Sequence, residues 1–209
     1  FFAEVPIYDP KTNEEDKRRN EYAEIFWNSR QRRGISLLDS QKWMRERNYF
    51  AAMMVNEGDA DALISGYSRS YPTVVKPILE LIGLDKGVTR AATTNLLMTQ
   101  RGPLFLSDTS ININPDSMDL TTIANMTATT VKMFGLQPVI AMVSFSNFGS
   151  SEHPSSKKVR ESVAYLHKYY PNLIVDGELQ TDFALNNDML QDIFPFSKLA
   201  GKKVNTLIF

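Results

Sequence analysis

The sequence predicts an α/β fold with a mainly parallel β-sheet. Segments with a helical spacing of apolar residues alternate with short strand-like segments, and the loops between them are short. Residues 139–145 contain no polar alternation, which is typical of a strand buried on both faces of a parallel sheet. The length of 209 residues and the hydrophobic content of 43% suit one large or two small globular domains.

The first part of the chain predicts two consecutive helices. The first covers about residues 14–28, because acidic side chains stand in its first turn and Gly34 can end it. The second covers about residues 37–54, with Ser36 or Asp39 near its N-terminal cap. Both helices carry regularly spaced aromatic residues, which are most simply core residues.

A short strand and a third helix follow. Ala62-Leu-Ile64 predicts a short buried strand that Ser65 and Gly66 close. Pro72 is favourable at the start of a helix that runs to Ile82, and Gly83 ends it.

The second part of the chain predicts most of the sheet. Asp116 caps a helix in which Leu120, Ile123, Thr127, Val131 and Phe134 share one face. A further helix starts at Ser155 or Ser156, with Val159, Val163, Leu166 and Tyr170 on one face. The predicted strands are residues 90–98, 103–107, 139–145, 173–175 and 204–209.

A seam near Gly87 divides the chain into two predicted lobes, residues 1–88 and 89–209. The chain begins with two phenylalanines and stops at Phe209, inside a segment that predicts a buried strand. A parallel-sheet protein is not expected to end there, so we expect a piece of a longer polypeptide.

Composition excludes several functions. The sequence has no cysteine, which excludes disulfides, thiolate metal sites and cysteine nucleophiles. Its 23 basic and 24 acidic residues nearly cancel, so we expect no nucleic-acid partner. The longest apolar run, residues 139–143, is far shorter than the roughly 20 residues that cross a bilayer, and no leader segment opens the chain. We therefore expect a cytoplasmic protein without a membrane partner.

Positive charge is concentrated in residues 11–47, which contain ten basic and seven acidic residues. Arg30, Arg32 and Arg33 lie within four positions of one another. This cluster indicates either a solvated helix end or an anion site, because guanidinium groups match phosphate geometry.

Three polar segments follow predicted strands, where ligands bind in open α/β sheets. The first segment can hold a phosphate through backbone N–H groups and a helix N-terminus, and the second can hold a carbonyl or a phosphate. Each can equally be an ordinary loop. The third segment has carboxylates that can orient a base or bind a hydroxyl, or Asp176 can cap the next helix. Their candidate residues are Ser65, Gly66, Arg69, Ser70, Thr73 and Lys76 in the first, Ser144, Ser146, Asn147, Gly149 and Ser150 in the second, and Asp176, Glu178 and Gln180 in the third.

Other chemistries find little support. His153 and His167 have neither the spacing nor the neighbours of a zinc site, so we expect no metal and a structural or exposed role for both. Neither the dinucleotide fingerprint nor the P-loop motif occurs in the sequence.

Several motifs in a fixed order resemble the phosphate acetyltransferase and phosphate butyryltransferase family over nearly the whole chain. They include Gly58-Asp-Ala-Asp61, Ile64-Ser-Gly66, Val143-Ser-Phe-Ser146, Val175-Asp-Gly-Glu-Leu-Gln180 and Ala200-Gly-Lys202. Three further motifs are similar to the phosphotransacetylase-like C-terminal domain of bacterial NADP-dependent malic enzymes. They are Ser68-Arg-Ser-Tyr-Pro72, Ser146-Asn-Phe-Gly149 and Phe194-Pro-Phe-Ser197.

The resemblance implies a three-layer α/β/α fold with mainly parallel sheets in two lobes, as in isocitrate and isopropylmalate dehydrogenases. It also implies a CoA site in a cleft between the lobes. The family arginines that hold CoA and acyl phosphate correspond to Arg30, which matches, and to position 76, which is a lysine here. Phe148 stands where transferases that act alone usually have lysine. The family's catalytic segment and its opening strands are absent, so no catalytic residue is assigned.

Three functions are compatible with this resemblance. The leading one is a regulatory, oligomerising domain of an NADP-dependent malic enzyme that binds acetyl-CoA, with NADP and a divalent metal bound only in the malic part. The alternative is an active phosphate acetyltransferase that uses CoA, acetyl phosphate and phosphate. The third is a homo-oligomer interface whose ligand site is degenerate.

Overall fold

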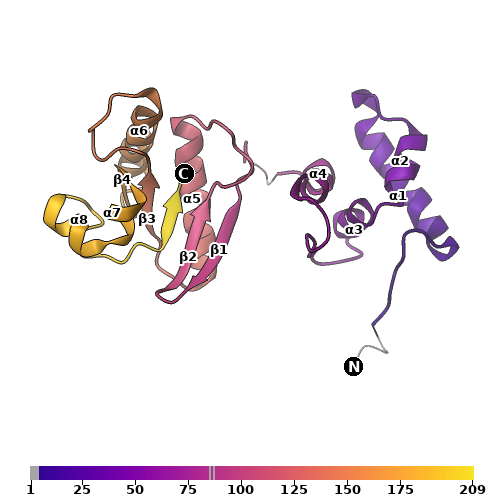
Figure 1. Cartoon of the computed structure of the whole chain (residues 1–209). Helices are drawn as coiled ribbons and strands as arrows, with labels where there is room; N and C mark the ends of the chain where they lie inside the picture. Colours follow the sequence, from indigo (N-terminus) through magenta and orange to yellow (C-terminus); the bar gives the residue numbers. More distant parts are fainter. Residues whose placement is uncertain (1–4, 85, 87) are drawn as a thin grey trace. The chain divides into compact units, whose positions relative to one another are not determined.

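The computed structural model describes residues 5–84, 86 and 88–209. The chain forms two compact units, Phe1–Thr89 and Arg90–Phe209 (Figure 1), which we call unit 1 and unit 2. The predicted seam near Gly87 lies outside the described residues. No helix in the described part of the chain is long and apolar enough to cross a membrane.

Unit 1 is helical in its described residues. The predicted helices at residues 14–28 and 72–82 are confirmed to within two residues at each end. Aromatic side chains of the first and third α-helices pack together in its core, where Phe26 and Phe50 are almost fully buried. The helices are η1 (Asn13–Glu15), α1 (Asp16–Arg30), η2 (Gln31–Arg33), α2 (Leu37–Trp43), α3 (Arg47–Asn56) and α4 (Tyr71–Leu81).

The prediction of one helix over residues 37–54 is wrong, because the chain forms two. Ser36 caps α2 in a reciprocal capping box with Asp39. Glu46 then leaves the helical conformation, and its carboxylate accepts hydrogen bonds from the backbone N–H groups of Asn48 and Tyr49, at 2.8 and 3.3 Å. This second cap begins α3.

The predicted buried strand at residues 62–64 is also wrong. Ile64 is 98% exposed, and the segment is an irregular loop. A strand needs a neighbour for its backbone hydrogen bonds, and the described residues of unit 1 contain no other strand that could pair with it.

Unit 2 contains a mixed five-stranded sheet in the order β1-β2-β5-β3-β4. The first two strands form an antiparallel hairpin, and the remaining pairs are parallel. Strand β3 lies between β5 and β4, as the uniformly apolar sequence predicts. The strands are β1 (Thr94–Thr99), β2 (Gly102–Ser107), β3 (Val139–Val143), β4 (Ile174–Leu179) and β5 (Thr206–Ile208).

Helices cover both faces of this sheet. On one face, α5 (Ser117–Met133) and α6 (Pro154–Tyr169) pack against Ile140 and Met142 of β3. On the other, α7 (Thr181–Leu185) and α8 (Asn187–Ile193) pack against Val139 and Ala141. These layers make the α/β/α arrangement visible in Figure 1. Phe134 and Tyr170 were predicted to share the apolar faces of α5 and α6. Each instead follows the end of its helix, and they are 58% and 38% exposed.

Strand β4 is longer than predicted and carries a bulge. Met142 pairs with Gly177 and Val143 pairs with Leu179, so Glu178 is an extra residue in the ladder. Gly177 has φ +149°, and a Cβ there would lie 2.4 Å from the carbonyl oxygen of Met142. Only glycine fits at this position. The bulge places the carboxylate of Glu178 in the interior of unit 2, where it is fully buried.

Candidate functional site

In unit 1 the two predicted cations, Arg30 and Lys76, meet at Glu80 of α4. Arg30 Nη2 donates a hydrogen bond to the Glu80 carbonyl oxygen. Lys76 Nζ lies 3.9 Å from Glu80 Oε1 and 5.4 Å from the centre of the Trp43 ring. Glu80 therefore contacts both predicted cations, Arg30 through its backbone carbonyl and Lys76 through its carboxylate.

Tyr49 completes this arrangement. Its hydroxyl donates a 2.6 Å hydrogen bond to Glu80 Oε2, and its ring stacks on Trp43 at 5.4 Å between centres. Burial, followed by the hydrogen bond to Glu80, raises the pKa of the Tyr49 phenol. The phenol therefore stays protonated and keeps donating to Glu80.

The first predicted loop lines a cavity of about 450 Å³ in unit 1, which includes Ser65, Gly66 and Arg69. Ser65 Oγ donates to Asn48 Oδ1 at 2.7 Å, and Arg47 Nη2 donates to Ser68 Oγ at 2.7 Å. Sequence reasoning missed both Asn48 and Arg47. A signal existed for Asn48, which is a polar residue beside the apolar positions of α3.

Ser70 and Thr73 of the first loop lie outside the residues that line this cavity. Their hydroxyl oxygens lie 2.8 Å apart, at the start of α4. Ser65, Gly66 and Arg69 are thus brought together, whereas Ser70 and Thr73 form a separate pair.

The second predicted loop, residues 144–151, forms its cradle around the buried Glu178. Glu178 Oε1 accepts hydrogen bonds from the Gly149 backbone N–H at 2.8 Å and from Ser146 Oγ at 3.3 Å. The Phe148 backbone N–H donates to the Glu178 carbonyl oxygen at 2.7 Å. A carboxylate of the chain itself therefore takes the position that the sequence assigned to a carbonyl or phosphate ligand.

Asn147 and Gln180 join the loop to the end of β4. Asn147 Nδ2 donates to Gln180 Oε1, and the Gln180 backbone N–H donates to Asn147 Oδ1, both at 2.7 Å. Ser150 Oγ accepts from the Asn147 backbone N–H at 3.0 Å, and Ser144 Oγ lies 3.3 Å from Ser156 Oγ. The predicted residues of the second segment are thus brought together with Glu178 and Gln180 of the third, but their donors point into the loop.

Arg160 of α6 is a site residue that sequence reasoning missed. Its Nε lies 3.2 Å from Glu178 Oε2, its Nη1 lies 3.1 Å from Glu152, and its Nη2 donates to the Ser151 carbonyl oxygen at 2.7 Å. A buried carboxylate needs a counter-charge, which is the signal that could have pointed to a basic residue on α6.

Asp176 lies inside β4 and does not cap the following helix, so that open alternative is wrong. Its Oδ2 accepts hydrogen bonds from Ser197 Oγ at 2.9 Å and from the Lys198 backbone N–H at 2.8 Å. These bonds hold the segment after α8 against the sheet.

Phe148 belongs to an aromatic cluster. Its ring centre lies 5.0 Å from those of both Phe194 and Phe196, and Phe183 packs on Phe194 at 5.1 Å. Two of the motifs that resemble malic enzyme, residues 146–149 and 194–197, therefore meet in space.

The two histidines have structural roles, as predicted. His153 caps α6 by accepting from the Ser155 backbone N–H, and His167 Nε2 lies 2.8 Å from the Val175 carbonyl oxygen. Among the described residues, no three His, Asp or Glu side chains gather in a group that could hold a metal ion.

Comparisons with known proteins support the family that the sequence motifs resemble. The family model described as phosphate acetyl/butaryl transferase matches residues 2–209. The NADP-dependent malic enzyme of Escherichia coli (strain K12) is 36% identical over 190 residues, which are 90% of this chain and 25% of that protein. The phosphate acetyltransferase of Bacillus subtilis (strain 168) is 33% identical over 205 residues, which are 98% of this chain and 62% of that protein.

A solved structure of the same family has a similar fold. A phosphotransacetylase structure from Streptococcus pyogenes superimposes with a TM-score of 0.79 at 34% identity, covering 97% of this chain and 60% of that one. The chain thus spans a quarter of the malic enzyme and about three fifths of these transferases. The predicted fold class is confirmed, and the chain belongs to the phosphate acetyl/butaryl transferase family.

Proposed function

We propose that this chain is an acetyl-CoA-binding, regulatory and oligomerising domain of a cytoplasmic NADP-dependent malic enzyme. The observation that carries this proposal is the packing of Phe148 on Phe194 and Phe196. At the position where the resemblance implies a lysine in transferases that act alone, this chain has a partly buried phenylalanine in an aromatic cluster and no cation. A phosphate leaving group gains no stabilising charge from Phe148.

The cations of unit 1 support ligand binding better than catalysis. Lys76 provides a point charge and lacks the two-pronged geometry with which arginine holds a phosphate. It also shares its charge with Glu80, 3.9 Å away. Arg30 remains as the guanidinium that would hold a CoA phosphate, alongside the polar loop at Ser65, Gly66 and Arg69. NADP and the divalent metal would bind in the malic part of the enzyme.

The proposal is tested on the intact malic enzyme that carries the domain. Acetyl-CoA is titrated by calorimetry, acetyl-CoA formation from acetyl phosphate and CoA is assayed, and NADP-dependent malate oxidation is measured with and without acetyl-CoA. We expect binding, negligible transferase turnover and inhibition of malate oxidation. Turnover comparable with that of transferases that act alone contradicts the proposal.

Arg30→Ala and Arg32→Ala form a matched pair of variants. Both remove one arginine charge from the same short segment, but Arg32 lies exposed in η2. We expect Arg30→Ala to weaken acetyl-CoA binding roughly tenfold or more, as for the loss of a charge-assisted hydrogen bond, and Arg32→Ala to leave it nearly unchanged. Equal affinities in the two variants contradict the role of Arg30.

An active phosphate acetyltransferase is the second candidate. The match of Arg30 to an arginine that the family resemblance implies, and the 33% identity to a phosphate acetyltransferase, favour it. It predicts CoA-dependent consumption of acetyl phosphate that Arg30→Ala reduces, in the same assay.

A further inference from the structure

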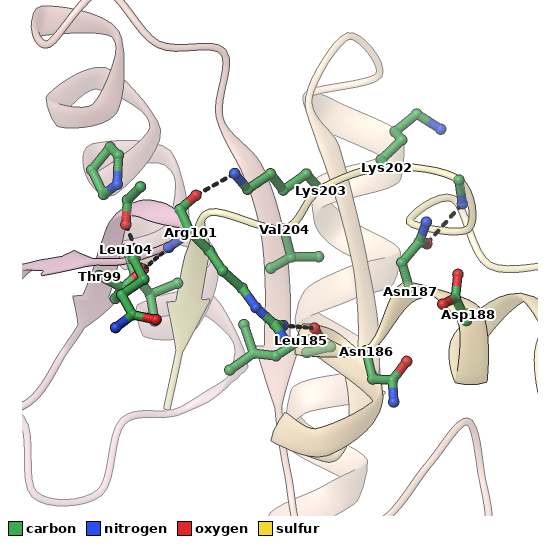
Figure 2. Close-up of a pocket in the computed structure, with 15 residues that line it drawn as sticks. Thr99, Arg101, Leu104, Leu185, Asn186, Asn187, Asp188, Lys202, Lys203 and Val204 are labelled. Carbon is green, nitrogen blue, oxygen red and sulfur yellow. Dashed lines mark hydrogen bonds between the residues drawn. The ribbon is translucent and has the colours of Figure 1, made fainter.

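A cavity in unit 2 lies away from loop 144–151. It has a volume of about 970 Å³ and is formed by the turn of the β1–β2 hairpin, the junction of α7 and α8, and the segment that leads into β5. These segments meet at the amino ends of β2 and β5, whereas loop 144–151 follows the carboxyl end of β3. Figure 2 shows the side chains that line the cavity.

The charge of the lining is unbalanced. Arg101, Lys202 and Lys203 contribute three cations, and Asp188 is the only acidic residue among the lining residues. None of the ion pairs formed by the described residues includes any of these three cations. Like charges gathered at one cavity repel one another, and a bound anion would relieve that repulsion.

Neutral groups hold these cations in place. Lys202 Nζ donates at 2.7 Å to the carbonyl oxygen of Lys198, which does not line the cavity, and its side chain points away from Arg101 and Lys203 in Figure 2. Arg101 Nη1 donates to the Leu185 carbonyl oxygen at 3.2 Å, so the side chain reaches from the hairpin to the end of α7, as Figure 2 shows. Lys203 Nζ donates to the Arg101 carbonyl oxygen, which joins the segment before β5 to the same turn. A carbonyl oxygen orients a cation without cancelling its charge, so both groups keep their attraction for an anion.

The polar side chains of the cavity also favour an anion. Asn187 Oδ1 accepts from the Gly201 backbone N–H at 2.9 Å, and Asn186 Oδ1 accepts from the Met189 backbone N–H at 3.2 Å. Both amides use their oxygen in the fold, and among the described hydrogen bonds neither uses its NH₂ group. The cavity therefore offers N–H donors in excess of acceptors.

We propose that this cavity binds a polyphosphate anion, held by the Arg101 guanidinium and the Lys203 ammonium group. A guanidinium can hold two phosphate oxygens at once, and the ammonium group matches a further charge of a diphosphate. The volume lies in the range of small-molecule sites. This proposal does not depend on the acetyl-CoA site proposed in unit 1.

Inorganic pyrophosphate is the probe, titrated by calorimetry into the full polypeptide at about 0.1 M salt, where distant surface charges are screened. The double variant Arg101→Ala/Lys203→Ala is compared with Lys157→Ala/Lys168→Ala, which removes the same charge from exposed positions on α6. We expect pyrophosphate to bind roughly tenfold more weakly to the first variant than to the second.

Asp188→Asn provides a test of opposite sign, which a misfolded variant cannot imitate. Removing the one acidic side chain of the lining should tighten pyrophosphate binding severalfold. The proposal is overturned if the unaltered protein does not bind millimolar pyrophosphate, or if both double variants bind it equally well.

CoA also contains a diphosphate, so the two proposed sites must be distinguished. Pyrophosphate is therefore titrated into Arg30→Ala as well. Unchanged affinity assigns pyrophosphate to the cavity of unit 2, whatever becomes of acetyl-CoA binding. Loss of pyrophosphate binding in Arg30→Ala assigns it to unit 1 and overturns the proposal.

Discussion

Glu178→Gln is the most informative single change, because every oxygen of this buried carboxylate has a partner. Oε1 accepts from the Gly149 N–H and the Ser146 hydroxyl, and Oε2 faces Arg160 Nε. A glutamine has one oxygen and one NH₂ group. Whichever way the amide turns, its NH₂ group meets a donor, either on Arg160 or on Gly149.

The expected cost follows from that conflict. A buried donor left without an acceptor costs about 1–3 kcal/mol, so we expect the free energy of unfolding to fall by about 2 kcal/mol. For a chain of this size this lowers Tm by about 4–8 °C. The loop 144–151 should loosen at the same time, since its backbone is held by the same carboxylate.

Urea unfolding followed by circular dichroism measures the change, and Glu152→Gln is the matched control. Glu152 contacts the same arginine, with Nη1 to Oε1 at 3.1 Å, but its side chain is 80% exposed. We therefore expect little change in the control. If Glu178→Gln is as stable as Glu152→Gln, the buried carboxylate does not hold the loop and our reasoning is refuted.

Three further predictions concern other positions. Gly177→Ala should cost at least about 3 kcal/mol, since its Cβ meets Met142, whereas Gly135→Ala, also at positive φ but with open space, should cost about 1 kcal/mol by urea unfolding. Burial alone would raise the pKa of Asp108, but hydrogen bonds from Thr93 and Asn112 outweigh it and lower the pKa from 3.8 to about 2. Because the pKa of Asp108 is lower in the folded state, this stabilisation is present above about pH 4 and is lost as the pH falls toward 2. The free energy of unfolding should therefore fall less between pH 5 and pH 3 in Asp108→Asn than in the unaltered protein, as measured by urea titration. Lys76→Arg should tighten acetyl-CoA binding about threefold in calorimetry, because a guanidinium holds two oxygens, and unchanged affinity would place the ligand elsewhere.

Much of the fold was predictable because local signals agree with the tertiary structure. Asp116 caps α5 through a capping box, and the apolar residues of α5 and β3 face the core as their spacing predicts. The break between α2 and α3 was not predictable, because its cap is Glu46, a residue type that seldom caps helices. The strand at residues 62–64 failed because strand formation depends on a neighbour and not only on apolar residues.

The sequence predicted which residues gather at this loop, but not that their hydrogen-bond donors point toward Glu178. Ser146, Asn147 and Gly149 do gather with Glu178 and Gln180 at the end of the sheet. Their donors point inward because the bulge carries Glu178 beneath the loop, and a bulge leaves little trace in an alternating pattern. Arg160 was missed because its partner lies 18 positions away in sequence and on another element.

The extra residue in β4 interrupts the regular alternation of side chains between the two faces of the sheet. Val175 belongs to the core under α5 and α6, yet Leu179, four positions later, belongs to the core under α7 and α8. In a regular strand both would face the same way. Deleting one residue at Gly177 or Glu178 would therefore do more than shorten the strand, because it would turn Leu179 toward the face that α5 and α6 cover. The bulge that Gly177 permits thus decides which of the two cores receives the side chain of Leu179.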